Sequence, residues 1–417
     1  MKIVMVNKFF YNFGGTEQVF FELSNILEKN GHQVIPFSMQ DKKNKKTDFE
    51  KYFPTNLNYK KSSIFYKIEK FPKIISRVIY SPESRRKITR LIRDTRPDIA
   101  HIHMIEHHIS PSILYALKEF NIPIVQSVNT YKIVCPNYLL YNKRRGGVCE
   151  RCIGGQYYNV VINRCVKNSL PASLLACMEM YIHRWTRVYR NLVDLYIVSN
   201  NFRREKMISD GYQPRKIKVL HHPLNVDNYH VQEDIHDYFV YFGRFSREKG
   251  ILTLLKAMEK VKLSKLILIG QGEQEKELKE FVRKNELNNI EFIGPKWGRE
   301  LQEIVGKAKF VVLPSEWYEG VPMVIYQSFA MGKPVIGAKI GGIPEEIDDG
   351  INGLLFNPGD IEGLSAKINF LLRNRKACRS YGMNARKKAE AEFHPQTYYT
   401  KIYRIYQELL SKKGRAL

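Results

Sequence analysis

The segment 309–336 reads KFVVLPSEWYEGVPMVIYQSFAMGKPVI. Its first residues, 309–313, are mostly apolar and predict a short buried strand. From 323 to 331 apolar residues recur at helical spacing, and Gly332 is a residue type that commonly ends a helix. A second apolar run follows Pro334 and predicts the next strand. This order of strand, loop, helix and strand is typical of an α/β domain with a parallel sheet.

The loop between that first strand and the helix is suited to a ligand. Glu319 opens it, and Gly320 and Pro322 are residue types that favour a fixed turn. The start of a helix offers free N–H groups and positive potential, which attract phosphates and sugar hydroxyls. In open α/β sheets, ligands bind outside the carboxyl ends of the strands. We therefore expect Glu319 to lie in a binding site.

The same segment resembles the donor-site signature of the retaining glycosyltransferases of family 4, which have the glycosyltransferase-B fold. Members usually show a Glu, seven residues and a second Glu; here Glu319 takes the first position and Gln327 the second. The similarity continues through GGIPE at 341–345 and NGLL at 352–355. The resemblance implies an α/β protein of two doubly wound, Rossmann-like domains that face each other across a cleft.

Length and charge narrow the class of protein. The chain has 417 residues, enough for two or three domains, and its 44% hydrophobic content is ordinary for a globular protein. The net charge of +25 favours anionic partners, namely nucleotide sugars, acidic lipid surfaces or nucleic acid. Simple solubility is the alternative explanation of the charge. No nucleic-acid-binding motif is recognisable, so we expect no nucleic acid as partner.

The N-terminus and the cysteine content predict a cytoplasmic protein. The apolar stretch near Met1 is too short for the core of a signal peptide. No run of about 18 apolar residues occurs, so no membrane span is expected. Six cysteines in a cytosolic chain argue against a disulfide framework.

The first strand, residues 2–6, runs into a loop with Gly14 and Gly15 and then into an amphipathic helix. Strand, Gly-rich loop and helix form the first unit of a doubly wound sheet, although the dinucleotide fingerprint G-x-G-x-x-G is absent. A polar connection over 222–236 marks the domain boundary. We predict an acceptor-side domain over 1–222, a nucleotide-sugar domain over 223–395, and a helix over 396–417 that, by resemblance, packs back on the N-terminal domain.

A basic amphipathic helix is predicted over 64–79, with Lys67, Lys70, Lys73 and Arg77 between apolar positions. Such a helix can lie on an anionic membrane with its apolar face at the headgroup boundary. Pro72 predicts a kink in it. The alternative is that the helix buries this face on its own domain. Membrane docking would make the protein peripheral on the inner face of the membrane.

Two features of the N-terminal half concern histidine: a pair of histidines in one strand, and a position where a histidine of similar proteins is absent. His101 and His103 are two residues apart in a predicted strand and therefore share one face. A structural role for this pair is favoured over metal binding. Family members with a similar sequence around Cys135 commonly carry His-Asp where this chain has Asn129 and Thr130. In the family that His lies near the donor sugar; Asn129 can still give and accept hydrogen bonds, but it cannot carry charge or move a proton near neutral pH.

Four cysteines lie in an insertion at about 135–165 with the spacing C-x13-C-x2-C-x12-C. A set that includes C-x-x-C predicts a structural, tetrahedral Zn²⁺ site, which would fold a loop with little core of its own. Redox chemistry and independent thiols are the alternatives. The candidate zinc ligands are Cys135, Cys149, Cys152 and Cys165. Cys177 and Cys378 lie outside the pattern and are predicted core residues.

Residues 243–250, GRFSREKG, follow a predicted strand and resemble the family's diphosphate-binding element. Arg244 can hold phosphate oxygens through two N–H groups, and Lys249 adds a mobile point charge. Both would offset the negative charge that builds on a departing nucleoside diphosphate. With Glu319 holding sugar hydroxyls, these residues form the predicted catalytic set, and no cofactor is required for the chemistry.

The resemblance extends to further contacts with the nucleotide-sugar donor. Gln327 stands where the family's Glu contacts the ribose, and its neutral carbonyl is a weaker acceptor than a carboxylate. The predicted donor-binding residues are Gly15, Asn129, Gly270, Gly272, Ile293, Gly320, Val321, Pro322 and Gln327.

The resemblance implies transfer of a sugar from a UDP- or GDP-sugar to a glycan or lipid-linked hydroxyl, with retention at the anomeric carbon, in surface polysaccharide synthesis. Asn129 and Gln327 depart from the family pattern and keep an alternative open. In that alternative the chain is a donor-binding or scaffold subunit of a glycan assembly complex with weakened catalysis. The base, the sugar and the acceptor are not determined by the sequence.

Overall fold

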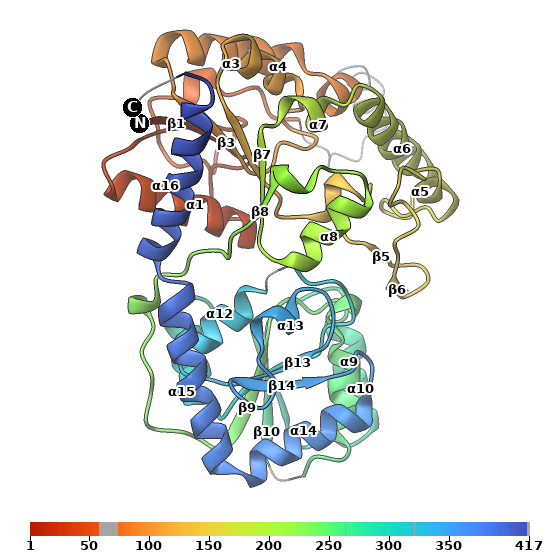
Figure 1. Cartoon of the computed structure of the whole chain (residues 1–417). Helices are drawn as coiled ribbons and strands as arrows, with labels where there is room; N and C mark the ends of the chain where they lie inside the picture. The colour runs from red at the N-terminus through yellow and green to blue at the C-terminus, as the bar shows by residue number, and fades with distance from the viewer. Residues whose placement is uncertain (58–73, 263, 321, 415–417) are drawn as a thin grey trace.

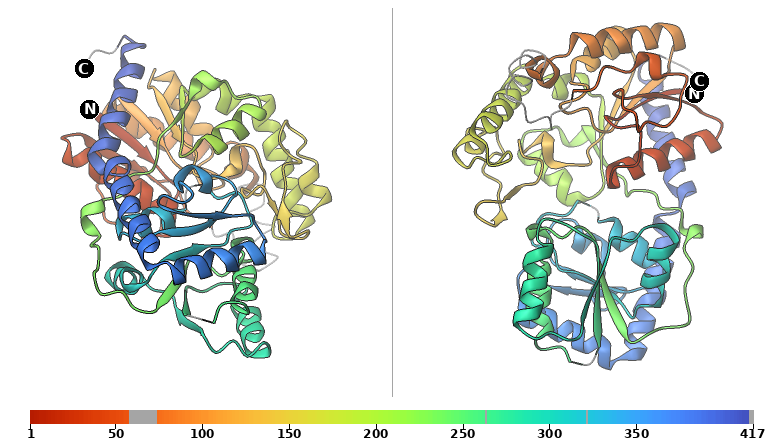
Figure 2. Two further views of the ribbon diagram at one scale, coloured as in Figure 1. Left: turned by 60° about the horizontal axis from the view of Figure 1, so that its bottom comes forward. Right: turned by 180° about the vertical axis from the view of Figure 1, so that it is seen from behind.

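The computed structural model describes residues 1–57, 74–262, 264–320 and 322–414. They form two α/β domains, one above the other, joined by a connection and by the last helix (Figure 1). Each domain contains a six-stranded parallel sheet with helices on both faces, and Figure 2 shows this layering from behind. The predicted fold class, two doubly wound domains, is confirmed.

The N-terminal sheet has the order β2-β1-β3-β4-β7-β8. Its strands are β1 (Lys2–Val6), β2 (Gln33–Phe37), β3 (Ile99–Ile102), β4 (Ile124–Ser127), β7 (Leu195–Val198) and β8 (Ile217–Val219). Its helices are α1 (Gly15–Lys29), α3 (Pro82–Thr95), α4 (Ser112–Glu119), α7 (Val188–Leu192) and α8 (Asn201–Ser209). Between β4 and α7 the chain adds a hairpin and two helices, β5 (Tyr141–Asn142), β6 (Gly147–Val148), α5 (Asn159–Ile162) and α6 (Leu170–Trp185).

The C-terminal sheet has the order β11-β10-β9-β12-β13-β14. Its strands are β9 (Tyr238–Phe242), β10 (Lys265–Ile269), β11 (Ile290–Gly294), β12 (Val311–Leu313), β13 (Val335–Ala338) and β14 (Gly353–Phe356). The helices are α9 (Ile251–Met258), α10 (Glu275–Lys284), α11 (Gly298–Lys307), α12 (Met323–Ala330), α13 (Ile343–Glu346), α14 (Ile361–Arg373), α15 (Arg375–Glu392) and α16 (Pro395–Ser411). The order reverses between β9 and β12, which is where an open sheet leaves a crevice for a ligand.

Burial explains why segment 309–336 forms the elements that it does. Val311 and Val312 are fully buried because helices cover both faces of β12. A strand buried on both faces needs a continuous apolar run rather than alternation, and 309–313 supplies one. Gly332 closes the following turn with a positive φ of 66°. The direction of the chain therefore reverses between α12 and β13 at a residue type that tolerates this conformation.

The last helix, α16, leaves the C-terminal domain and crosses to the N-terminal one (Figure 1). Its apolar face is buried with Ile3 and Phe20 of the N-terminal domain in one hydrophobic cluster. The residues of α16 in this cluster are Tyr398, Ile402, Ile405, Tyr406 and Leu409. The phenol oxygen of Tyr406 lies 2.5 Å from His101 Nδ1. Helix α16 thus ties the two domains together.

Two polar contacts join the domains beside the cleft. The Glu345 carboxylate accepts hydrogen bonds from the backbone N–H groups of Asn201 and Phe202, at 2.7 and 2.6 Å. These groups are the first turn of α8, where a negative charge is favoured. His221 Nδ1 lies 3.2 Å from Glu346 Oε1, and that carboxylate is fully buried. Both acidic residues belong to α13, so this short helix holds the N-terminal domain at two points.

Most of the predicted basic helix over 64–79 lies outside the described residues, which resume at 74. In the described part, Arg77 is buried and forms an ion pair with Glu83 at 2.6 Å. Arg77 therefore does not contribute to an exposed basic face. No helix in the ranges that the structure describes is long and apolar enough to cross a membrane.

The His221–Glu346 contact predicts a pH-dependent contribution to stability. The hydrogen bond with Glu346 raises the pKa of His221 above its ordinary value. A group whose folded-state pKa is raised stabilises the protein fully below its unfolded pKa, about 6.5, and this stabilisation is lost as pH rises through the folded-state pKa. We expect His221→Gln to lower the thermal unfolding midpoint more at pH 6 than at pH 9.

The matched control is His236→Gln, because His236 pairs with Asp234 on the surface, where both side chains are exposed. It should change the midpoint little at either pH. An equal loss at pH 6 and pH 9 in His221→Gln would contradict a charged histidine in the contact.

Candidate functional site

The carboxyl ends of β9 and β12 bring together a buried ion pair. Lys249 Nζ lies 2.6 Å from Glu319 Oε1, and the Glu319 side chain is only 5% exposed. The same carboxylate oxygen accepts a hydrogen bond from Ser315 Oγ at 2.6 Å. The Lys249 ammonium also lies over the Trp317 ring, 5.2 Å from its centre. Removing either charge would leave the other buried and unpaired, at a cost of about 3–5 kcal/mol.

Arg244 stands at the mouth of this site. Its Nη2 donates to Glu248 Oε1 at 2.7 Å, and the arginine side chain is 60% exposed while the glutamate is fully buried. Burial opposes the ionisation of Glu248, but hydrogen bonds from its own backbone and Ser246, with the charge of Arg244, bring its pKa below the ordinary value. A carboxylate thus anchors one edge of the guanidinium, while the exposed part of this group is accessible to an anion.

Two glycines after β10 lie where two loops are in contact, and a side chain there would collide with the neighbouring backbone. A Cβ on Gly272 would lie 2.1 Å from the backbone oxygen of Phe245, and one on Gly270 would lie 1.9 Å from that of Gly243. Gly270 also has a φ of 149°, which disfavours other residues. The loop after β9 therefore packs directly on the loop after β10. Ile293, at the end of the neighbouring strand β11, is partly exposed beside them.

The loop from Glu319 to α12 contacts the N-terminal domain. The Gly320 backbone oxygen accepts a hydrogen bond from Asn200 Nδ2, and a Cβ at Gly320 would collide with the Arg203 guanidinium. Pro322 precedes the first turn of α12, which has no side-chain cap. Gln327, one side of which is exposed, directs Nε2 toward the Tyr229 hydroxyl at 3.5 Å. Val321 lies outside the described residues.

Asn129 lies in the loop after β4 of the N-terminal domain. Its Nδ2 lies 3.3 Å from His103 Nδ1, and its buried Oδ1 has no hydrogen-bond partner within the described residues. A buried acceptor without a partner is costly, and a hydroxyl group of a ligand would satisfy it. In the same loop, burial raises the pKa of the Tyr131 phenol to about 12, and the charge of Glu319, from the C-terminal domain, contributes. The loop after β4 and the Glu319 loop are therefore neighbours.

The two histidines of β3 form a neutral pair. The rings of His101 and His103 stack with centres 4.8 Å apart, and both are buried. Burial lowers the pKa of His101 to about 3 and holds the pKa of His103 well below its ordinary value. Gly15, the first residue of α1, is exposed, with open space around the position of a Cβ. Among the predicted donor-binding glycines, Gly15 is the one whose Cβ position has no described atom within 4 Å.

All four cysteines of the insertion line one cavity of about 10 Å³. Burial and the neighbouring cysteines raise the pKa of Cys165 to about 11, and the Cys135 thiol donates to Asn137 Oδ1 at 3.0 Å. The six cysteines are free thiols. The donor set has the chemistry of a structural zinc site. In the described ranges, however, no three His, Cys, Asp or Glu side chains are arranged to hold a metal ion, so the sulfurs would have to move to form one.

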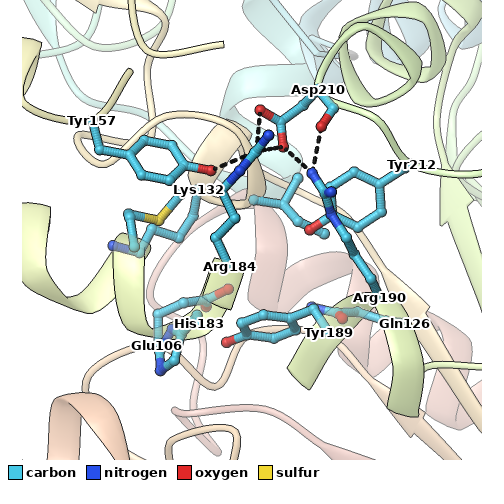
Figure 3. A pocket seen from close by; sticks show the side chains of 12 residues that line it. Glu106, Gln126, Lys132, Tyr157, His183, Arg184, Tyr189, Arg190, Asp210 and Tyr212 are labelled. Atoms are coloured by element: carbon cyan, nitrogen blue, oxygen red, sulfur yellow. Dashed lines mark hydrogen bonds and ion pairs between the residues drawn. The ribbon is translucent and has the colours of Figure 1, made fainter. Parts of the chain in front are cut away.

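A separate cavity lies in the N-terminal domain under α6 and α7 (Figure 3). Asp210 accepts hydrogen bonds there from Arg184 and Arg190, at 3.3 and 2.9 Å. The free volume is about 30 Å³, room for a few water molecules but not for a nucleotide. The charges in this cavity satisfy each other and serve the packing of the insertion, so the candidate site is the cleft at Glu319.

Several residues of the cleft were absent from the sequence predictions. Ser315 lies four residues before Glu319 in segment 309–336, and this spacing is the sequence signal from which its contact with Glu319 could have been predicted. Asn200 and Arg203 come from the N-terminal domain and contact Gly320 only through the tertiary fold. No local pattern connects residues about 120 positions apart.

Comparisons with known families cover nearly the whole chain. Residues 13–228 match the family described as Glycosyltransferase Family 4. Residues 228–388 match the family described as Glycosyl transferases group 1. The two matches follow one another and meet in the connection before β9.

The chain is similar to several known proteins over part of their length. It is 31% identical to an uncharacterized glycosyltransferase of Methanocaldococcus jannaschii over 191 residues, 46% of this chain and 53% of that protein. It is 25% identical to a sulfoquinovosyl transferase of Arabidopsis thaliana over 330 residues, 77% of this chain and 58% of that protein. With an amylovoran biosynthesis glycosyltransferase of Erwinia amylovora it shares 25% over 214 residues, 48% of this chain and 49% of that protein. The chain thus spans only about half the length of these relatives.

Solved structures share the fold across the whole chain. HepE of Anabaena, in complex with UDP, superposes with a TM-score of 0.68 at 17% identity, over 98% of this chain and 100% of that one. Sucrose-phosphate synthase of Thermosynechococcus elongatus superposes with a TM-score of 0.72 at 18% identity, over 99% of each chain. At such identities the likeness shows the two-domain fold alone.

Proposed function

This chain belongs to glycosyltransferase family 4, and we propose that it transfers a sugar from a nucleotide-sugar donor to a hydroxyl group of an acceptor. The family predicted from segment 309–336 is confirmed by the matches over 13–228 and 228–388. The observation that carries the proposal is the Lys249–Glu319 pair, beside Arg244, at the point where the strand order of the C-terminal sheet reverses. Two cations and one carboxylate there are suited to a diphosphate and to sugar hydroxyls.

Each side chain has a role in the proposed reaction. Arg244 would hold phosphate oxygens through its exposed N–H groups while Glu248 anchors it. Lys249 has three N–H donors and can contact a phosphate without leaving Glu319. Glu319 would accept hydrogen bonds from sugar hydroxyls, and Gln327 from the ribose. Held in place before the reaction, the two cations would offset the charge that develops on the leaving diphosphate.

We propose that transfer proceeds with retention and without a protein nucleophile. The bond between the anomeric carbon and the diphosphate oxygen breaks, and the acceptor oxygen bonds to the same face. The acceptor proton passes to the leaving diphosphate. In this scheme Asn129 orients the donor sugar through its unpartnered Oδ1 and moves no proton. No cofactor takes part in the chemistry.

UDP is the nucleotide that we would test first, because HepE was crystallised in complex with UDP. A GDP-sugar is the second choice. The similarity to an amylovoran biosynthesis enzyme supports a glycan or lipid-linked acceptor in surface polysaccharide synthesis. The competing proposal, a donor-binding scaffold, draws on Asn129, which cannot move a proton. It predicts nucleotide binding without turnover.

The first prediction concerns nucleotide binding. In a thermal-shift panel of UDP, GDP, ADP and their sugar conjugates, the nucleotides of one base should stabilise the protein. The stabilisation should be about 2.7 kcal/mol at a ligand concentration a hundred times Kd. Arg244→Gln should weaken binding of the nucleoside diphosphate about tenfold, because a phosphate contact is lost. Binding of the nucleoside without phosphates should be unaffected. Arg375→Gln is the control, since Arg375 is exposed at the start of α15.

Release of the nucleoside diphosphate from the preferred donor then separates the two proposals. Turnover supports the enzyme, and binding without turnover supports the scaffold. No stabilisation by any nucleotide at millimolar concentration would refute the donor site itself.

A second prediction concerns Gln327. A carboxylate accepts a stronger hydrogen bond from a ribose hydroxyl than a neutral amide does. We therefore expect Gln327→Glu to tighten nucleotide binding about fivefold, equivalent to about 1 kcal/mol, as measured by calorimetry. Tyr229→Phe in the same assay controls for loss of the Gln327 contact to the Tyr229 hydroxyl. Unchanged or weaker binding in Gln327→Glu would mean that this position does not contact the ribose.

We also propose that the insertion holds a structural Zn²⁺ through Cys135, Cys149, Cys152 and Cys165. All four sulfurs face one cavity, and formation of thiolates would release the Cys135 donor bond to Asn137. We expect about one zinc per chain by elemental analysis, lost in Cys149→Ser/Cys152→Ser but kept in Cys177→Ser. Chelation should lower the unfolding midpoint. Purified protein without zinc, whose stability chelators do not change, would leave the cysteines as independent or redox-active thiols.

A further inference from the structure

Helix α6 has one buried face of mixed polarity and one exposed face that is apolar. One face is buried and includes Ala176, Cys177 and Met180. The opposite face is exposed and carries no charged side chain. Its large residues are Leu170, Leu174, Met178, Tyr181 and Trp185, which are 48%, 50%, 46%, 39% and 86% exposed. Their spacing of three or four residues places them in one row along the helix.

Helix α5 widens this row. Tyr158 and Ile162 are 50% and 65% exposed, and α5 packs beside α6 at the outer side of the N-terminal domain (Figure 1). The Tyr158 backbone N–H donates to the Tyr181 hydroxyl at 3.4 Å, which joins the two helices at the row. Of the fifteen large hydrophobic side chains that are exposed in the described residues, eight lie between 148 and 185. A concentration of this kind marks an interaction surface.

Positive charge surrounds the apolar row. Residues 141–192 contain nine Lys and Arg but only two acidic residues, Glu150 and Glu179. Glu150 pairs with Lys206 at 2.5 Å, and Glu179 is buried against Lys132 at 2.6 Å. Both acidic side chains of this region are therefore paired with lysines, while Arg184 and Arg190 pair with Asp210. The exposed face of this region presents cations to a partner.

The cations stand at both ends of α6. Arg164 and Lys167 precede the helix, and Arg187 follows it; all three are exposed. Trp185, the last residue of the apolar row, lies two positions before Arg187. Aromatic residues next to Lys or Arg around an apolar face are typical of the boundary between lipid headgroups and acyl chains. A helix of 16 residues is about 24 Å long, so it suits an orientation parallel to the bilayer rather than across it.

From this arrangement we propose that the exposed face of α5 and α6 docks the protein on an anionic phospholipid surface, with Leu174, Met178 and Trp185 inserted among the lipids. A second copy of this chain is a poorer occupant of the face. A symmetric contact would bring the same cations of both copies together, and like charges repel. Acidic headgroups match the cations, while the acyl region accepts the apolar row.

The docking surface is connected to the cleft through the cysteine-containing insertion. The hairpin of β5 and β6, in the same insertion, reaches the C-terminal domain, where Lys143 Nζ lies 2.9 Å from Glu273. The insertion therefore joins the docking surface to the domain that carries Lys249 and Glu319. If the proposed function holds, a membrane-borne acceptor would meet the cleft from this side; docking itself does not rest on that function.

Sedimentation of the full chain with vesicles tests the proposal. At low salt, the protein should bind vesicles that contain both phosphatidylcholine and phosphatidylglycerol. Its partition coefficient with vesicles of phosphatidylcholine alone should be at least tenfold lower. Leu174→Ser/Trp185→Ser should reduce the partition coefficient at least tenfold, because it removes inserted apolar groups. Arg164→Gln/Lys167→Gln/Arg187→Gln should reduce binding and its dependence on salt.

The matched control is Trp297→Ser/Phe370→Ser, because these side chains are 71% and 42% exposed on the C-terminal domain. This variant should bind vesicles like the wild type. The unfolding midpoint and the nucleotide-induced shift should be unchanged in all α6 variants, which separates failure of docking from failure of the donor site. Trp185 fluorescence should shift to shorter wavelength with anionic vesicles.

Two results would overturn the proposal. In the first, wild-type protein does not sediment with anionic vesicles at low salt, or the α6 variants bind as well as the control does. In the second, light scattering shows a dimer that Leu174→Ser/Trp185→Ser dissociates, which would assign the face to a second copy of the chain.

Discussion

The ion pair between Lys249 and Glu319 is the contact on which the rest of the site depends. Both charges are largely removed from water, so the loss of either side chain would leave the other without a counter-ion. The pair joins the loop after β9 to the loop after β12, the two central strands of the C-terminal sheet. The Glu316 backbone N–H also donates to the Glu248 backbone oxygen at 2.9 Å. The loops that would receive a diphosphate are therefore locked to each other before any ligand arrives.

The two domains are held together by contacts of different kinds. Glu345 binds the first turn of α8 through a charge at a helix N-terminus, and α16 buries an apolar face on the N-terminal domain. Asn200 also donates to the Gly320 backbone oxygen, next to Glu319. The N-terminal domain thus supports the loop that carries Glu319 directly as well as facing it.

The insertion between β4 and α7 gives this chain features that the two sheets do not require. It contains the four clustered cysteines, the hairpin that reaches Glu273, and the exposed apolar row of α6. The insertion has a small hydrophobic cluster of its own, and the buried Glu179–Lys132 pair adds an ionic contact; the cluster contains Cys152, Tyr157, Val160, Cys177 and Met180. The outer face of the insertion is then free to be apolar, since the stability of the insertion does not depend on covering that face.

The sequence by itself determined the elements around segment 309–336, and its motifs implied two doubly wound domains through their resemblance to a known family. Local periodicity and turn chemistry suffice for the elements, because a buried parallel strand needs an apolar run and a helix end favours Gly332. The identity of the residues that meet was decided only by the tertiary structure. Lys249 and Glu319 are 70 positions apart, and Asn200 and Gly320 are 120 apart, so strand order and domain packing bring them together. The apolar sequence of α6 likewise could not say which face is covered, because exposure depends on the elements that pack against a helix and not on its own pattern.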